Sequence, residues 1–128
     1  MAGKRGSVAL LVMGVLGGAA CYHVNSTVLD TPAPPADLYR CLQLELGREG
    51  YAIVGADRAS GWLHAQRRIE RVWEVVTAEV YATVIPDEAD GSHLQLTDNN
   101  WAEEDMDRIV QRCAPNSVAG AAGSGGEQ

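Results

Sequence analysis

Three cysteines, Cys21, Cys41 and Cys113, are the residues of this chain with the clearest capacity for covalent chemistry. We predict a disulfide between Cys41 and Cys113, because both fall on apolar helix faces and an exported chain meets an oxidising compartment. The alternative is two buried free thiols that act as small hydrophobic side chains. Cys21 is then left over, and an odd cysteine in a secreted protein needs its own explanation.

Three histidines, His23, His64 and His93, could in principle bind a metal ion. Their spacing does not match a zinc site, since the chain has neither a C-x-x-C motif nor a Cys/His cluster. His64 and His93 should share one face of a sheet, but a third strand would separate them. We therefore predict no metal site and no cofactor.

Nucleophilic catalysis is also poorly supported. Ser60, Ser92, His64 and Asp57 are of suitable types, but no G-x-S-x-G elbow positions a serine. No phosphate-binding loop follows the first twenty residues, and the acidic residues cluster in loops and at one helix start. The sequence predicts no catalytic residues, so we expect a protein that is not an enzyme.

Two helices should frame the domain that positions these side chains. Pro34 or Pro35 suits a first helical turn, and Gly50 suits the end of that helix near Glu49. A last helix should follow Asn100, with Asn100 as its cap, and run to Cys113. The first helix has apolar residues at helical spacing, namely Leu38, Cys41, Leu42 and Leu46.

Four strands are predicted between the helices, at about 51–56, 61–67, 72–85 and 92–97. The third alternates most clearly between apolar and polar residues. Simple hairpins would place Leu63 opposite Val76 and Leu94 opposite Val84, with apolar faces in agreement. The predicted fold class is α+β: a two-layer sandwich in which both helices pack on one face of a four-stranded antiparallel sheet, in the order α-β-β-β-β-α.

The other face of that sheet would remain open, and it holds more aromatic residues than a solvated sheet needs. Such residues are enriched at protein interfaces, so we predict a partner-binding face. The alternative is that cross-strand aromatic pairs stabilise the sheet itself. The residues assigned to binding are Trp62, His64, Trp73, Tyr81 and His93, and the same face should carry Gln66, Val75, Thr77, Glu79 and Gln95.

The first twenty-one residues have the three parts of a secretory signal: a positive start at Lys4 and Arg5, a short apolar core, and small residues before Cys21. With a cysteine at the cleavage point, this segment resembles a bacterial lipoprotein signal, although Gly18 stands where that family usually has leucine. The resemblance implies a lipid such as palmitate on Cys21, which would anchor the protein to a membrane of the bacterial envelope, facing the periplasm. Tyr22, which is not acidic, favours the outer membrane. The alternatives are a secreted, soluble product and an uncleaved anchor.

The predicted layout is a signal at 1–20, a Pro-rich tether at 21–36, a domain at 37–113 and a disordered Gly/Ala/Ser tail at 114–128. The chain has a net charge of -7, and loss of the two basic residues of the signal makes it more negative. An acidic chain without a basic patch argues against nucleic acid as a partner.

The signal, the tether and the phrase CLQLELGREGYAIVGADRASGWLHAQR, which starts at Cys41, resemble small uncharacterised envelope lipoproteins of bacteria. That family brings no known activity. We expect a non-enzymatic binding or accessory module that meets an envelope protein through the open sheet face. The alternatives are a purely structural envelope component and a small secreted domain that binds or hydrolyses a ligand.

Overall fold

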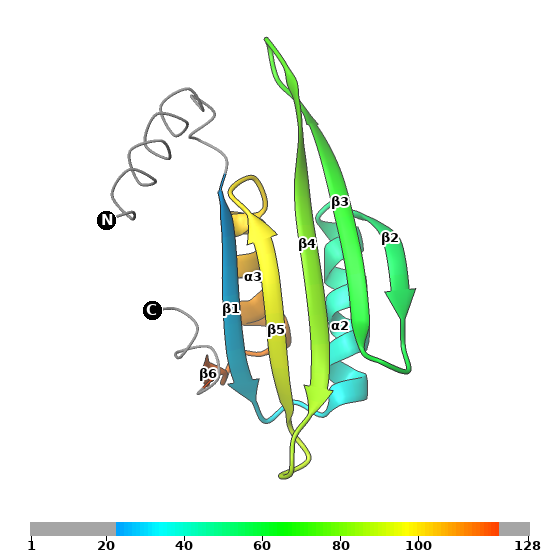
Figure 1. The fold of residues 1–128 in the computed structure, drawn as a ribbon, viewed down its shortest axis with the longest axis vertical. Coiled ribbons are helices and arrows are strands. Elements are labelled where there is room, and N and C mark those ends of the chain that lie inside the picture. The colour runs from blue at the N-terminus through cyan, green and yellow to red at the C-terminus, as the bar shows by residue number, and fades with distance from the viewer. Residues whose placement is uncertain (1–22, 121–128) are drawn as a thin grey trace, which may run out of the picture.

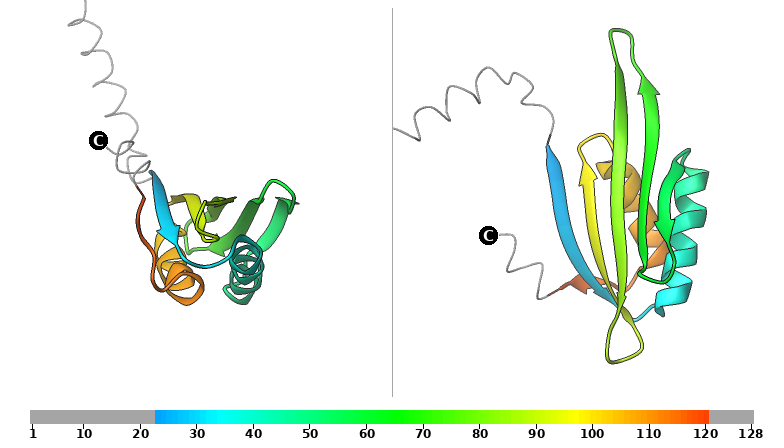
Figure 2. Two further views of the ribbon diagram at one scale, coloured as in Figure 1. Left: turned by 90° about the horizontal axis from the view of Figure 1, so that it is seen from below. Right: turned by 45° about the vertical axis from the view of Figure 1, so that its right-hand side comes forward.

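The computed structural model describes residues 23–120, which form a twisted antiparallel sheet with two helices on one face (Figures 1 and 2). The sheet has six strands in the order β2-β3-β4-β5-β1-β6. Along the chain the elements are β1 (Val24–Thr31), α2 (Pro35–Arg48), β2 (Ala52–Asp57), β3 (Trp62–Glu70), β4 (Val75–Pro86), β5 (Ser92–Asn99), α3 (Glu103–Cys113) and β6 (Val118–Ala119).

The prediction of a four-stranded sheet is wrong, and so is the element order that went with it. β1 lies in the segment that we expected to be a tether, and it pairs along its length with β5, from Val24 opposite Asn99 to Thr31 opposite Ser92. β6 adds a short pairing with Leu29 and Asp30. β1 is rich in β-branched residues, which favour strands. Only Thr31 of its side chains is buried. β1 therefore does not need the regular apolar alternation by which a strand is predicted from sequence.

The central four strands form the predicted meander, but one hairpin has a different register. Val84 pairs with Leu94 as expected, whereas Leu63 pairs with Ala82 rather than Val76. The two registers differ by an even number of residues, so the apolar faces still agree. The turn between β3 and β4 therefore lies further along the chain than predicted, and the hairpin extends beyond the body of the domain (Figure 1).

The helix boundaries agree with prediction at α2 and differ at α3. Gly50 follows α2 with a φ of 94°, a left-handed conformation that glycine adopts without steric cost. α3 has Ala102 at its N-cap with no side-chain cap, so the predicted cap by Asn100 is wrong. The Oδ1 atom of Asn100 instead accepts a hydrogen bond from the backbone N–H of His23, at 3.1 Å. Asn100 thus holds the start of β1 beside the end of β5.

The hydrophobic core fills the space between the two helices and the covered face of the sheet. α2 contributes a row of leucines, and α3 contributes Met106 and Ile109. The middle strands contribute many alanines and valines, small side chains that let helices lie close to a sheet. The buried residues of these strands are Leu63, Ala65, Ala78, Val80, Ala82, Val84, Leu94 and Leu96.

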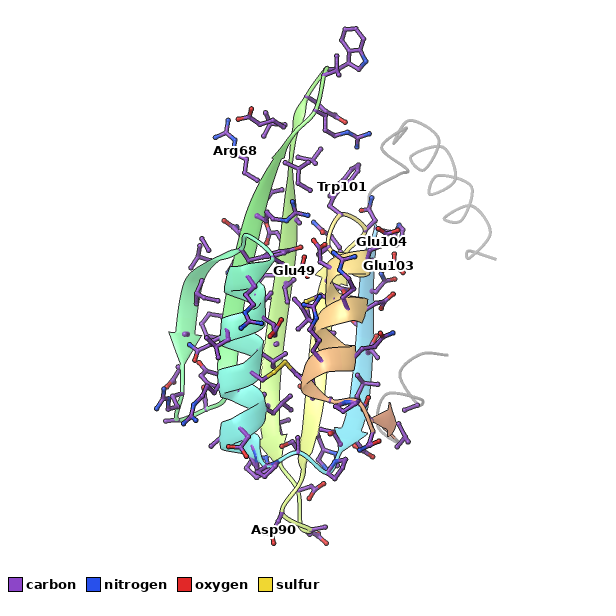
Figure 3. All side chains as sticks on the ribbon, turned by 180° about the vertical axis from the view of Figure 1, so that it is seen from behind. Glu49, Arg68, Asp90, Trp101, Glu103 and Glu104 are labelled. Atoms are coloured by element: carbon purple, nitrogen blue, oxygen red, sulfur yellow. A yellow bond between two sulfur atoms is a disulfide. The ribbon has the colours of Figure 1, made fainter. Side chains whose placement is uncertain are left out.

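Two kinds of link join α2 to α3. The first is the predicted disulfide between Cys41 and Cys113, which is present with a Cα–Cα distance of 5.7 Å and is visible between the helices in Figure 3. The second is a set of ion pairs in which Arg112 contacts Glu45 at 2.8 Å and Arg108 contacts Glu49 at 3.1 Å. The helices run antiparallel, so these links form a ladder along their facing sides.

Asp105 ends this ladder and was not expected to be buried. It belongs to the acidic cluster at the start of the last helix, yet Asp105 is only 6% exposed. Its Oδ2 atom accepts hydrogen bonds from the hydroxyl of Tyr51 and from Arg67, both at 2.7 Å, and its Oδ1 atom accepts one from Arg108. Burial alone would raise the pKa of Asp105, but the bonds from Tyr51 and Arg67 lower it overall. Burial also raises the pKa of Tyr51, and the neighbouring Asp105 raises it further.

Removing the disulfide should destabilise the domain. A Cys41→Ser, Cys113→Ser double variant frees two residues that are 72 positions apart. Opening a loop of that size lowers the free energy of unfolding by about 2–4 kcal/mol. Urea unfolding of the oxidised wild type and the double variant measures this loss. The reduced wild type is the control and should match the variant, and equal midpoints for all three samples would contradict the prediction.

Replacing Asp105 should also destabilise the domain, in a pH-dependent way. Asp105→Asn leaves Arg67 without a carboxylate partner and leaves Arg108 with Glu49 alone, which should cost about 2–4 kcal/mol at neutral pH. Because the folded pKa of Asp105 is lowered, its contribution is present at neutral pH and is lost as the pH falls below about 4. Urea unfolding should show a smaller difference in the free energy of unfolding between wild type and Asp105→Asn near pH 3 than near pH 7. Glu104→Gln, at an exposed neighbouring position, should show no comparable loss at either pH.

Candidate functional site

The open face of the sheet carries one compact group of aromatic and polar side chains on β3 and β4. His64 and Tyr81 face each other across the two strands. Their rings are stacked, with centroids 4.0 Å apart and an interplanar angle of 11°. The ring of Trp62 lies beside them, with its centroid 6.5 Å from that of His64. Both helices lie behind the other face, so neither helix covers this group (Figure 2).

Glu79 is the polar centre of this group. Its Oε1 atom accepts a hydrogen bond from the Tyr81 hydroxyl at 3.2 Å and lies 3.2 Å from Nε2 of His64. Its Oε2 atom accepts a hydrogen bond from the side chain of Gln66 at 3.3 Å. The backbone N–H of Glu79 donates to Oδ1 of Asn99, on β5. These bonds hold four side chains of the open face in one arrangement. We call Trp62, His64, Gln66, Glu79 and Tyr81 the aromatic patch.

Trp62 is positioned by the neighbouring strand β2. A Cβ atom placed on Gly55 would lie 2.8 Å from the Trp62 ring, so the missing side chain of Gly55 lets the ring approach β2 this closely. The pairing of β2 with β3 shifts between Ile53 and Gly55, which marks a β-bulge at this point. Trp62 is 37% exposed and Tyr81 41% exposed. Each ring is therefore packed on one side and open to solvent on the other.

The structure brings together three of the five residues assigned to binding and separates the other two. Trp62, His64 and Tyr81 belong to the aromatic patch. Trp73 lies in the turn of the β3–β4 hairpin, away from the patch, because the turn falls further along the chain than predicted. His93 lies toward the other end of the open face, where its Nδ1 atom contacts Oδ1 of Asp30 on β1. The sequence analysis did not single out Asp30, because the segment that forms β1 was expected to be a tether. Cys21, the predicted lipidation site, lies outside the described residues.

A cavity of about 260 Å³ opens at the end of the domain where α2 begins. It lies between the first turns of α2, the β2–β3 turn and the end of β4. Gly61 holds that turn against β4: it has a φ of 75°, and a Cβ there would lie 2.2 Å from the carbonyl oxygen of Val84. Arg40 and Arg58 line the cavity together with Tyr39 and Ser60. Neither arginine has an acidic partner within residues 23–120, and the sequence pattern gave no sign of this site.

A second hollow, between β1 and α3, is lined by acidic residues. Burial, together with the nearby charges of Glu103 and Asp107, raises the pKa of Asp98 to about 6. Across the described range, no group of three or more His, Cys, Asp or Glu side chains is arranged to hold a metal ion. No helix in that range is long and apolar enough to cross a bilayer.

Comparison with known proteins leaves the family open. No family model matches the chain, and no curated protein matches its sequence. Among solved structures, Ara h 8.0201 aligns over 72% of this chain and 92% of its own, with a TM-score of 0.37 and 10% identity. The aromatase/cyclase Zhui from Streptomyces sp. R1128 aligns over 71% and 86%, with a TM-score of 0.34 and 13% identity. TTHA0849 from Thermus thermophilus aligns over 71% and 87%, with a TM-score of 0.30 and 13% identity. Likeness at this level supports no conclusion about a ligand or an activity.

Proposed function

We propose that this chain is a non-enzymatic binding module of a bacterial cell envelope, tethered by a lipid on Cys21, that recognises a partner protein through the aromatic patch. The signal-like first twenty-one residues support the location. The observation that carries the binding role is the patch itself. It is a connected group of aromatic and polar side chains on a sheet face that neither helix covers.

The patch is suited to association because its side chains are already ordered. Partly exposed Trp and Tyr rings offer a large contact area. Here Glu79 and the stacked His64 hold the Tyr81 ring, and β2 supports the Trp62 ring. A partner that covers the patch would lose little side-chain entropy, and ordering costs of this kind otherwise reduce affinity. Trp and Tyr are also the residue types that carry most binding energy at interfaces.

The shape of the patch supports binding rather than catalysis. Catalytic groups act in a concave site that excludes water and holds a reacting atom. Trp62, His64, Glu79 and Tyr81 line neither of the two hollows described above. The pair of His64 and Glu79 resembles an acid–base pair, but here Glu79 is shared with Tyr81 and Gln66 on an open surface. A flat partner surface fits this arrangement better than a small substrate does.

Truncation of Trp62 should remove association without unfolding the domain. A photoreactive amino acid at Gln95, an exposed position on the same face, should crosslink a partner in intact cells. Trp62→Ala should reduce that product at least about tenfold, because hot-spot aromatic residues contribute about 2 kcal/mol or more. Immunoblotting of the tagged chain measures the product, and thermal unfolding measures stability.

Two controls make this test decisive. Trp73→Ala removes an equally large ring outside the patch and should leave the product unchanged. A photoreactive residue at Leu44, exposed on α2, should not give the same product. Loss of stability in Trp62→Ala with an unchanged crosslink would show that the patch only stabilises the sheet.

The cavity beside α2 favours a second candidate function, the binding of a small anionic ligand. Within residues 23–120, five arginines form ion pairs with carboxylates. Arg68 does not, and neither do Arg40 and Arg58, which line this cavity together. Arginine binds carboxylate and phosphate groups well. The lining also includes the apolar side chains of Val84 and Pro86, so a small acid with an apolar tail would suit it.

Titration with hexanoate tests this candidate. Chemical shifts of backbone amides at Ser60 and Gly61 should move with added hexanoate, because both residues line the cavity. Arg58→Gln should raise the Kd by about tenfold or more, since a charge-assisted hydrogen bond contributes about 1.5–3 kcal/mol. Arg68→Gln removes an arginine outside the cavity and should leave the Kd unchanged. Equal effects of both variants would indicate attraction to net charge alone.

A further inference from the structure

The tip of the β3–β4 hairpin is the most exposed apolar feature of the described chain. We use the name hairpin tip for residues 71–74, which connect the two strands. Val72 is 84% exposed and Trp73 is 91% exposed. Figure 1 shows the hairpin projecting well past the other strands and both helices. A soluble domain has no folding reason to place a tryptophan and a valine at its most distant point.

The remaining residues of the hairpin tip hold these two side chains forward. The backbone N–H of Arg71 donates to the carbonyl oxygen of Glu74 at 2.8 Å, which closes the turn. The guanidinium of Arg71 lies 4.9 Å from the ring centroid of Trp101, back toward the body of the domain. Val72 and Trp73 are therefore the farthest side chains, and arginine and a second tryptophan stand behind them. Trp and basic residues are the types enriched at membrane–water interfaces.

The hairpin tip and the start of β1 lie at the same end of the molecule (Figure 1). Val24, the first residue of β1, pairs with Asn99 on β5. On the other side of β5, Asp98 pairs with Val80 of β4, so Asn99 stands opposite Glu79. Val24 and Glu79 are therefore at the same level along the sheet. From Glu79 to Val75 the strand rises about 13 Å at about 3.3 Å per residue. The hairpin tip then lies beyond Val75, on the side from which the chain enters the domain.

We propose that the hairpin tip inserts Val72 and Trp73 into the surface of the lipid bilayer to which Cys21 is attached. This inference rests on the anchor that is part of the proposed function. Cys21 and Val24 are three residues apart, and three residues span at most about 11 Å. An acylated Cys21 thus keeps Val24 within about 11 Å of the membrane. The hairpin extends more than about 13 Å beyond the level of Val24 in the same direction, so the hairpin tip reaches the bilayer.

The charges around the hairpin favour an apolar contact with lipid over an electrostatic one. Figure 3 shows Arg68 on the hairpin, and Trp101, Glu103 and Glu104 around the start of α3. The chain as a whole carries a net charge of -7. The acidic start of α3 keeps the body of the domain away from anionic headgroups, while the uncharged pair Val72 and Trp73 enters the interface. Insertion should therefore depend little on anionic lipid or on salt.

Fluorescence quenching by brominated lipid tests this inference. The full-length chain, purified from bacterial membranes, is reconstituted into phosphatidylcholine vesicles with or without bromine on the acyl chains. The emission of wild type minus that of Trp73→Ser gives the signal of Trp73 alone. We expect bromine to quench this signal by about half or more, as for a ring at the acyl boundary. Added phosphatidylglycerol or salt should not change the quenching.

A matched variant and two further measurements keep the outcomes separate. Leu44→Ser removes exposed apolar surface on α2 and should leave the Trp73 signal quenched. Intact mass reports whether Cys21 is acylated, and flotation reports whether the chain is bound to vesicles. An acylated, vesicle-bound chain with an unquenched Trp73 overturns the inference and leaves the proposed anchor standing. An unacylated chain with a quenched Trp73 removes the anchor and supports the hairpin contact. An unacylated chain with an unquenched Trp73 overturns both.

Discussion

The contact between α2 and α3 is the constraint on which the rest of this structure depends. Two short helices cover one face of a six-stranded sheet, and a core of this size leaves little stability to spare. The Cys41–Cys113 bond joins the middle of α2 to the last residue of α3. Tyr51, Arg67 and Arg108 converge on the buried Asp105 at the other end of α3. Because these links hold the two helices side by side on one face, the opposite face of the sheet carries neither helix.

Successive side chains of β3 and β4 point to opposite faces of the sheet, and this alternation places the candidate site on the face without helices. Leu63, Ala65 and Val80 point to the helices, so His64, Glu79 and Tyr81 must point to the open face. The same register that builds the core therefore brings the stacked rings and the shared carboxylate together. Gly55 then lets Trp62 lie over β2 and extends the patch by one strand. The aromatic patch is thus a consequence of core formation and needs no separate structural element.

The sequence was informative wherever a pattern was local and periodic, and it failed wherever partners were distant. Helical spacing located α2, and the apolar faces of both helices led to the disulfide. Strand alternation placed Trp62, His64 and Tyr81 on one face. β1 was missed because its pairing with β5 spans most of the chain and only Thr31 is fully buried. Asp105 looked like one of several solvated acids, since its partners Tyr51 and Arg67 come from a different part of the sequence. Arg40 and Arg58 likewise meet only when the β2–β3 turn folds against α2.

The register of the β3–β4 hairpin decides how the surfaces are oriented. In the predicted register Trp73 would lie beside the other aromatic residues, but the observed turn carries it to the far end of a long hairpin. The two tryptophans therefore belong to different surfaces and cannot contact one flat partner together. If the hairpin tip meets the membrane, the strands run away from the bilayer and the aromatic patch faces sideways. The β2–β3 turn lies at the opposite end of β3 from the hairpin tip, so the arginine-lined cavity faces away from the membrane. With the hairpin tip in the membrane, both the aromatic patch and the cavity are accessible. If the open face lay flat on the bilayer instead, the aromatic patch would be covered.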